Sequence, residues 1–211
     1  MRLLRTLLFV PLALLFATAQ SHAAVMFHAD ITASQENPPT GMNAFGFADF
    51  LLNDAGTELS WTATIFGIDI TGTQSSDTTA DNLIAAHIHA PAPPGMNTGI
   101  VWGFFGSPDN DTNPDNLVIT PFATGLGGTF SSVWNQPEGN NGTTLTAQLP
   151  NLLAGNAYIN FHTTQFPGGA IRGQILTPEP TSLILLGTGL IGLARARRAA
   201  STRARRSSAS R

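Results

Sequence analysis

The 211-residue chain contains no cysteine and no lysine, and only 11% of its residues are charged. Without cysteine, a disulfide scaffold, a thiolate metal site and a cysteine nucleophile are excluded. The low charged fraction, beside 42% hydrophobic residues, excludes a solvated disordered chain. The 21 glycines and 14 prolines favour short elements joined by many turns over long helices.

The ten basic residues are all arginine, and they are distributed unevenly. Nine of them lie within the first five or the last seventeen residues, and only Arg172 lies between these ends. Residues 24–177 carry twelve acidic residues against this one arginine, which gives a net charge of −11. A body this acidic repels phosphate backbones, so we expect no nucleic-acid partner.

Residues 1–23 have the pattern of a secretory signal peptide. Two arginines precede the apolar stretch 6–17, and Ser21 and Ala23 are small residues at positions −3 and −1 of a cleavage site. The apolar stretch is short for a membrane span, although an uncleaved N-terminal anchor is the alternative. We therefore expect export, with cleavage after Ala23.

The C-terminus contains three successive segments: Pro178-Glu179-Pro180, an apolar run at about 181–194 and an arginine-rich tail at 195–211. The prolines end the preceding strand, and the apolar run predicts a short helix that contacts the membrane before processing. This order resembles the PEP-CTERM sorting signal of Gram-negative bacteria, here residues 178–211. The resemblance implies processing by an exosortase, with the export machinery as a further partner. It also implies location in the cell envelope or extracellular matrix; a simple membrane anchor is the alternative.

The body between these ends, residues 24–177, shows apolar residues that mostly alternate. From Leu59 to Ile65 every second residue is apolar, and a turn at 53–56 separates this segment from an earlier apolar run. A period of two is typical of strands that bury one face. We predict an all-β fold, an antiparallel β-sandwich or open Greek-key barrel, flanked by the signal peptide and a short C-terminal hydrophobic helix. The predicted strands are 25–34, 43–52, 59–65, 83–90, 99–105, 116–122, 129–134, 143–149, 157–163 and 170–176, with no helix among them.

Three histidines form the strongest candidate site. His87 and His89 are two residues apart on a predicted strand and therefore point to one face. The same alternation places His162 on the face opposite Ile159 and Phe161. If the two strands are neighbours and their Ile/Phe faces are core, the three imidazoles converge on one ion, which fits a Zn or Cu site. The alternative is that these histidines bond to the backbone, to Asp or to each other.

A second candidate site is the acidic loop 109–115. Asp109, Asp111, Asn113 and Asp115 alternate along it and offer the oxygen ligands that Ca²⁺ prefers. The glycine and glutamate that complete an EF-hand loop are absent, which excludes that motif. The loop predicts at most a weak Ca²⁺ site, and a solvated acidic turn is the alternative.

The remaining candidate is Arg172, the one cation of the body. We expect it to form a structural ion pair with one of the twelve acids and to order the last strand. No Gly-x-Ser-x-Gly motif and no phosphate-binding glycine loop is found in the sequence, so no catalytic residue is predicted.

Several segments of the body resemble, in order, the blocks of the CHRD domain, named after chordin. The resemblance implies a β-rich fold and no particular reaction, because the family's activity in bacteria is largely undefined. Ala170 replaces an acidic residue that usually precedes Ile-Arg-Gly, which removes a partner for Arg172 or for a metal. The His-x-His strand is also similar to copper/zinc superoxide dismutases, without their further ligands or disulfide. The matching blocks are Gln35-Glu36-Asn37-Pro38-Pro39, Ala86-His87-Ile88-His89, Gly99-Ile100-Val101, Leu152 to Thr163 and Pro167 to Ile175.

These observations predict an exported surface or extracellular-matrix protein. We expect a non-catalytic binding or structural module whose partner is extracellular polysaccharide or a surface protein. The alternative is a metalloprotein that holds Zn or Cu at His87, His89 and His162 and has redox or hydrolytic activity.

Overall fold

The computed structural model describes residues 24–112 and 117–178, together with Ile191 and Arg195. The predicted signal peptide with its cleavage at Ala23, and nearly all of the chain from Glu179 onward, lie outside the described residues. Among the residues that are described, no helix is long and apolar enough to cross a membrane.

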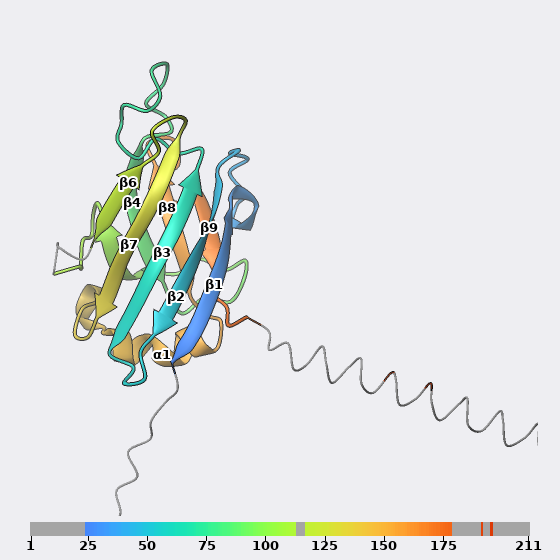
Figure 1. Cartoon of the computed structure of the whole chain (residues 1–211), viewed down its shortest axis with the longest axis vertical. Helices are drawn as coiled ribbons and strands as arrows, with labels where there is room; N and C mark the ends of the chain where they lie inside the picture. Colours follow the sequence, from blue (N-terminus) through green and yellow to red (C-terminus); the bar gives the residue numbers. More distant parts are fainter. Residues whose placement is uncertain (1–23, 113–116, 179–190, 192–194, 196–211) are drawn as a thin grey trace, which may run out of the picture.

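Nine strands form one antiparallel sheet (Figure 1), which confirms the all-β prediction. Their order across the sheet is β5-β4-β8-β9-β1-β2-β3-β7-β6. Strands β4, β8 and β9 therefore lie together in one half of the sheet, and β1, β2, β3, β7 and β6 make up the other half. The strands are β1 (Val25–Thr32), β2 (Phe45–Leu52), β3 (Glu58–Phe66), β4 (Leu83–His89), β5 (Ile100–Phe105), β6 (Val118–Pro121), β7 (Gly127–Asn135), β8 (Tyr158–Thr163) and β9 (Ile171–Gln174).

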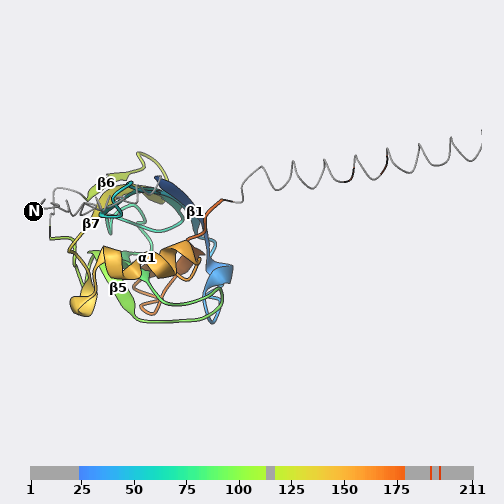
Figure 2. The ribbon, with the colours of Figure 1, turned by 90° about the horizontal axis from the view of Figure 1, so that it is seen from below.

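The sheet curls until its two halves face each other (Figures 1 and 2), and aromatic side chains pack between them. Trp102 of β5 stacks on Trp134 of β7, with ring centroids 5.4 Å apart. Phe161 of β8 meets Phe130 of β7 edge to face at 5.4 Å. These strands are distant in the sheet order, so the contacts close the sheet, and each pair adds about 0.5–1.5 kcal/mol beyond its burial. The result is a half-barrel whose inner face is apolar.

Strands β2 and β3 form the hairpin that the sequence predicts. Asn53 organises its turn, since its side-chain oxygen accepts a hydrogen bond from the backbone amide of Thr57 at 2.9 Å. Gly56 adopts a positive φ of 68°, a conformation that glycine allows without strain. The alternating residues of β3 that were expected to face the core, Leu59, Trp61, Ala63 and Ile65, are all buried.

The predicted strand 143–149 is wrong, as is the expectation of a body without a helix. Residues Leu145–Leu153 form helix α1, and Thr144 caps it by accepting a hydrogen bond from the amide of Ala147. Leu145 and Leu152 are fully buried, and Leu149 packs against the same core. These leucines are four and three residues apart, which is helical spacing. The helix lies across one end of the curled sheet (Figure 2).

The connection from β3 to β4 is built around a buried carboxylate, Asp69. One of its oxygens accepts hydrogen bonds from the amides of Thr71, Gly72 and Thr73, and the other accepts from the amide of Ser75 at 2.9 Å. Burial alone would raise the pKa of Asp69, but the backbone hydrogen bonds outweigh it and lower the pKa from 3.8 to about 2. The ionised carboxylate therefore stabilises this loop.

Replacing Asp69 by Ala is expected to lower the free energy of unfolding by about 3 kcal/mol, because several amides lose their acceptor. Because the folded pKa lies below the unfolded one, the ionised carboxylate stabilises the protein above pH 3.8, and this contribution is lost as the pH falls toward 2. Asp69→Asn should therefore flatten the acid limb of the stability curve. Urea unfolding at a series of pH values measures both effects.

The exposed Asp54 in the β2–β3 turn provides the matched control. Asp54→Asn should leave the stability at neutral pH nearly unchanged, because its side chain is exposed. Equal losses from the Asp54 and Asp69 variants would contradict the role assigned to the buried carboxylate.

Candidate metal centre

Three buried histidines converge where β4 pairs with β8. The antiparallel register places His87 opposite Asn160 and Ala85 opposite His162. The ligand nitrogens of His87, His89 and His162 all lie within 4.8 Å of one another. Strands β4 and β8 are therefore neighbours, and the three imidazoles lie together, as expected for neighbouring strands.

The histidines lie on the face of β4 and β8 that points away from the main core. Ile88, Ile159 and Phe161 occupy the core face, as expected. The opposite face is nevertheless not open to solvent, since the exposed fractions of the three histidines are only 2%, 6% and 6%. Backbone carbonyls of Thr98 and Pro167, from loops that cross this face, contact the imidazoles.

The hydrogen bonds fix which nitrogen of each ring is available. His89 Nδ1 is 3.0 Å from the carbonyl oxygen of Thr98, and His162 Nδ1 is 3.0 Å from that of Pro167. A carbonyl only accepts, so both Nδ1 atoms carry the hydrogen and both Nε2 atoms keep a free lone pair. His162 Nε2 is then the acceptor for His87 Nδ1 at 3.1 Å. His89 Nε2 and His87 Nε2 are buried without any hydrogen-bond partner.

Burial keeps all three imidazoles neutral at physiological pH. The pKa of His87 is lowered from 6.5 to about 4, mainly by burial and in part by the neighbouring His162 and His89. Burial likewise lowers the pKa of His89 to about 4, against the opposing effect of its hydrogen bond to Thr98. The pKa of His162 is also lowered by burial. Neutral imidazoles are the form that binds metal ions.

One pair of histidine nitrogens already has the spacing that a tetrahedral transition-metal ion needs. Zn–N bonds of about 2.0–2.1 Å place two ligand nitrogens about 3.3 Å apart, and His87 Nδ1 and His162 Nε2 are already 3.1 Å apart. Binding would replace the hydrogen between these two atoms by the ion, so that His87 coordinates through Nδ1. His89 and His162 would coordinate through Nε2, each oriented by the carbonyl on its other nitrogen.

Sequence reasoning assigned no role to Tyr158, which contacts this site. Its ring stacks on His89 with centroids 4.7 Å apart and an interplanar angle of 3°. The guanidinium of Arg172 lies 4.3 Å from the centre of the same ring. The alternation in β8 already places Tyr158 and His162 on one face, but it does not indicate the stack.

Arg172 makes contacts other than the expected ion pair. It donates hydrogen bonds to the backbone oxygen of Met96 and the side-chain oxygen of Asn97. Among the described residues, the ion pairs found join His28 to acidic residues, and none involves Arg172. Its charge is still felt by the buried Glu36, whose pKa burial raises to about 7 while Arg172 opposes the rise.

The proposed calcium loop is only partly described. Asn113 and Asp115 lie outside the described residues, so the calcium prediction stays a prediction. Asp111 is buried, and one of its carboxylate oxygens accepts a hydrogen bond from Ser132 at 2.9 Å. Asp109 accepts a bond from the amide of Asp111.

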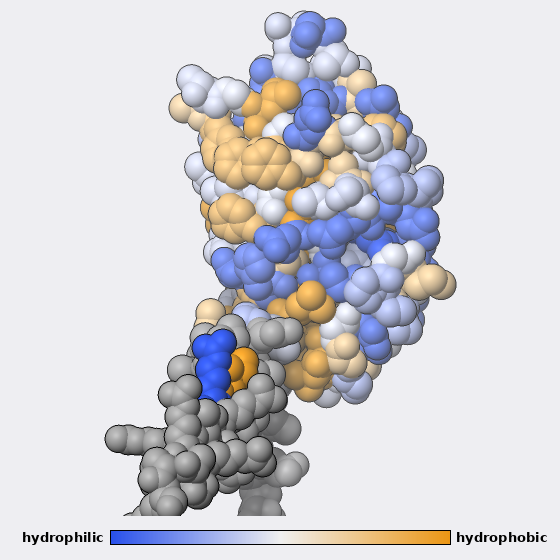
Figure 3. Space-filling model, turned by 90° about the vertical axis from the view of Figure 1, so that its right-hand side faces the viewer, coloured by the Kyte–Doolittle hydropathy of each residue, from blue (hydrophilic) through white to orange (hydrophobic). Residues whose placement is uncertain are grey.

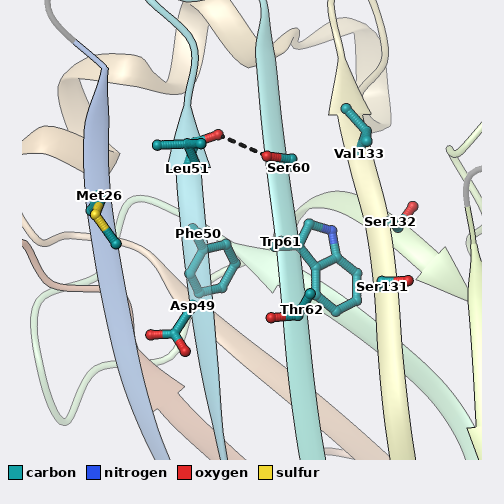
Figure 4. A pocket seen from close by; sticks show the side chains of 10 residues that line it. All are labelled: Met26, Asp49, Phe50, Leu51, Ser60, Trp61, Thr62, Ser131, Ser132 and Val133. Atoms are coloured by element: carbon teal, nitrogen blue, oxygen red, sulfur yellow. Dashed lines mark hydrogen bonds between the residues drawn. The ribbon is translucent and has the colours of Figure 1, made fainter.

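A separate hollow of about 400 Å³ lies on the outer face of the other half of the sheet (Figure 4). Side chains of β1, β2, β3 and β7 line it, among them Asp49, Thr62 and Ser131. None of the three buried histidines belongs to its lining. The hollow and the histidine cluster are therefore independent features.

Stability of the metal-free protein is expected to fall as the pH drops from 6.5 toward 4. Unfolding exposes histidines of ordinary pKa 6.5, whereas folded His87 and His89 bind protons only near pH 4. The unfolded state therefore takes up more protons in this window, which lowers the free energy of unfolding. Urea titrations of chelator-treated protein measure the slope, and His87→Gln or His89→Gln should reduce it.

His28 on the surface provides a control of opposite sign. Its hydrogen bond to Asp49 raises its pKa, so it stabilises the fold below pH 6.5 and this contribution is lost as the pH rises. His28→Ala should make the fall in stability toward low pH steeper. A flat curve in the wild-type protein would contradict the low pKa values of the buried cluster.

The CHRD domain family matches residues 27–175, which include all nine strands except the first two residues of β1, and the PEP-CTERM protein-sorting motif matches residues 176–198. A search of curated proteins and a search of solved structures gave no significant match. The sorting motif implies recognition by an exosortase, and with it export and sorting to the cell envelope of a Gram-negative bacterium. Because the first match covers well over half of the chain, the protein belongs to the CHRD domain family and carries a C-terminal PEP-CTERM sorting motif.

Proposed function

We propose that this protein holds a transition-metal ion, Cu or Zn, at His87, His89 and His162 while it is displayed at the cell surface. The observation that carries the proposal is the pair of unpartnered imidazole nitrogens, His87 Nε2 and His89 Nε2, buried beside His162. A buried polar atom without a partner costs about 1–3 kcal/mol. Coordination satisfies His89 Nε2 directly.

Ion binding also resolves the hydrogen-bonding state of His87. When Nδ1 coordinates the ion, the ring hydrogen moves to Nε2. The backbone of Ser107 lies near enough to His87 to oppose the lowering of its pKa. We expect this Nε2–H to take a backbone acceptor, as the Nδ1–H groups of His89 and His162 do.

The burial of the site supports a non-catalytic role for the ion. The three ligands are at most 6% exposed, which leaves a substrate little access to the ion. An ion at this place would link β4 to β8 and tie them to the loops that cross the site. It would therefore stabilise the exported domain, which contains no cysteine for disulfides.

Purified protein without an affinity tag of histidines is expected to bind one Cu(II) or Zn(II) ion per chain. His87→Ala, His89→Ala and His162→Ala should each weaken binding by more than about 100-fold, because loss of a ligand exceeds the 10–100-fold cost of losing a group that orients one. Metal content by mass spectrometry and competition with a chromophoric chelator measure stoichiometry and affinity.

His28→Ala is the matched control, since His28 is a partly exposed histidine on β1 outside the cluster. It should bind the ion like the wild-type protein. Circular dichroism of each variant separates loss of the site from loss of the fold. The proposal fails if folded wild-type protein binds neither ion, or if the three cluster variants retain it.

We further infer that the exported domain is a binding module for extracellular polysaccharide, which it contacts with the outer hollow. Asp49, Thr62 and Ser131 lie side by side there on neighbouring strands (Figure 4) and offer a carboxylate and two hydroxyls to sugar hydroxyls. Exposed Met26 and Leu51 offer apolar contact at its edge. Residues 24–177 have a net charge of −11, which favours a neutral polymer over an anionic one.

The side surface of the domain supports a role in contact with a hydrated matrix. Hydrophilic residues form a broad band across it, and hydrophobic residues lie in separate patches (Figure 3). Patches of this kind do not require an apolar partner.

In a Gram-negative host with an exosortase, the mature protein is expected to begin at Ala24 and to end near Pro178. We expect it in the envelope or matrix fraction, from which added neutral matrix polysaccharide releases it and a chelator does not. Asp49→Ala should shift it toward the soluble fraction, because the hollow loses its carboxylate. Mass spectrometry of both termini in each fraction measures processing and retention.

Asp54→Ala is the control for retention, because Asp54 is an exposed acid that does not line the hollow. A secreted form with an intact arginine tail would contradict the processing. Retention that is independent of Asp49 and insensitive to polysaccharide would instead indicate a surface protein as the partner and overturn the polysaccharide proposal.

A further inference from the structure

Arg172 ties an exposed loop to the sheet beside the histidine cluster. Its guanidinium is almost fully buried on β9, with only 1% of the residue exposed. The same nitrogen donates to the carbonyl oxygen of Met96 at 3.0 Å and to the side-chain oxygen of Asn97 at 2.9 Å. Both residues lie in the exposed loop between β4 and β5. The buried guanidinium of Arg172 therefore anchors the β4–β5 loop to the sheet through these two hydrogen bonds.

Tyr158 connects this arginine to a metal ligand. The guanidinium carbon lies 4.3 Å from the centre of the tyrosine ring, a cation–π contact. The ring is also parallel to the imidazole of His89, with centroids 4.7 Å apart. A shift of Arg172 is therefore expected to move the Tyr158 ring, on which the imidazole of His89 stacks.

The same loop fixes the other side of His89. Thr98 follows Asn97 directly, and its carbonyl accepts the hydrogen bond from His89 Nδ1 at 3.0 Å. Its amide donates to the hydroxyl of Tyr158 at 3.4 Å. Arg172 thus acts on the position of His89 through the stacked ring and through the backbone of residues 96–98, and its charge also lowers the pKa of His89 directly.

The chemistry of arginine suits this position better than that of lysine. A planar guanidinium stacks on an aromatic ring while it donates hydrogen bonds in its own plane, whereas an ammonium is a point charge. A buried charge without an ion-pair partner is costly, and this one is compensated by two oxygens and an aromatic ring.

We propose that Arg172 is a positioning residue for His89, holding its imidazole so that Nε2 is presented to the ion. The expected effect on metal affinity rests on the proposed metal function. The orientation of His89 itself does not require an ion. Arg172 acts through Tyr158 and through residues 96–98, and it does not itself coordinate. The loss of such an orienting group weakens metal binding by about 10–100-fold.

The test compares Arg172→Gln with Arg172→Lys in the whole CHRD domain protein. Arg172→Gln should weaken Cu(II) binding by about 10–100-fold and change the copper electron paramagnetic resonance spectrum. Arg172→Lys keeps the charge and should recover part of both. In the metal-free protein, nitrogen NMR of the imidazoles should show the Nδ1–H form of His89 in the wild type and a mixture of forms in Arg172→Gln.

Gln174→Ala is the matched control on the same strand. Gln174 is buried like Arg172, but its side chain holds the carbonyls of Ala92 and Gly155, outside residues 96–98. It should lower stability without changing the signals of His89. The inference is overturned if Arg172→Gln and Gln174→Ala lower stability alike and nothing else changes. In that case the NMR signals of His89, the copper spectrum and the copper affinity of Arg172→Gln and Arg172→Lys would all match the wild type.

The two proposals fail in different ways. If wild-type protein binds no ion and Arg172→Gln still disturbs the ring form of His89, the positioning role stands and the metal function fails. If the wild type binds an ion and the Arg172 variants bind it equally well, the metal function stands and the positioning role fails.

Discussion

The antiparallel ladder between β4 and β8 sets His87 opposite Asn160 and Ala85 opposite His162. These residues are far apart in the sequence, and no local preference brings them together. The ladder in turn depends on the aromatic contacts that curl the sheet, since Phe161 of β8 packs on Phe130 of β7 in the facing half. The apolar face of β8 thus anchors the strand, and the opposite face presents the histidine. Core and site are two sides of one strand.

Two loops bury and orient the histidines that the strands bring together. On an antiparallel sheet, the face away from the core is commonly solvated, and imidazoles there would titrate at ordinary pH. Here carbonyls of Thr98 and Pro167 cover the face and each binds an imidazole nitrogen. Burial lowers the pKa values, and the carbonyls select which nitrogen keeps its lone pair. A neutral, oriented and enclosed cluster results, and these are the properties that a resident ion requires.

The helix α1 and Arg172 show where sequence patterns mislead. Leu145 and Leu149 fit a period of two through Ala147 and fit helical spacing equally well, and only Leu152 in the following turn separates the patterns. Charge counting likewise predicts an acidic partner for the one internal arginine, yet it cannot show that carbonyl and amide oxygens and a tyrosine ring are nearer. The wrong strand and the unforeseen contacts of Arg172 have one cause: local patterns carry no information on which distant segment covers a residue.

The sequence by itself determined the class of the fold, the β2–β3 hairpin and the shared face of His87 and His89, because alternation and turn residues are local properties. It also carried the sorting motif, which is read as a linear segment. Only the tertiary structure decided that β8 lies beside β4, that loops bury the histidines, and that Tyr158 and Arg172 support His89. These features depend on how the sheet curls and on which loops cross it, and long-range packing fixes both.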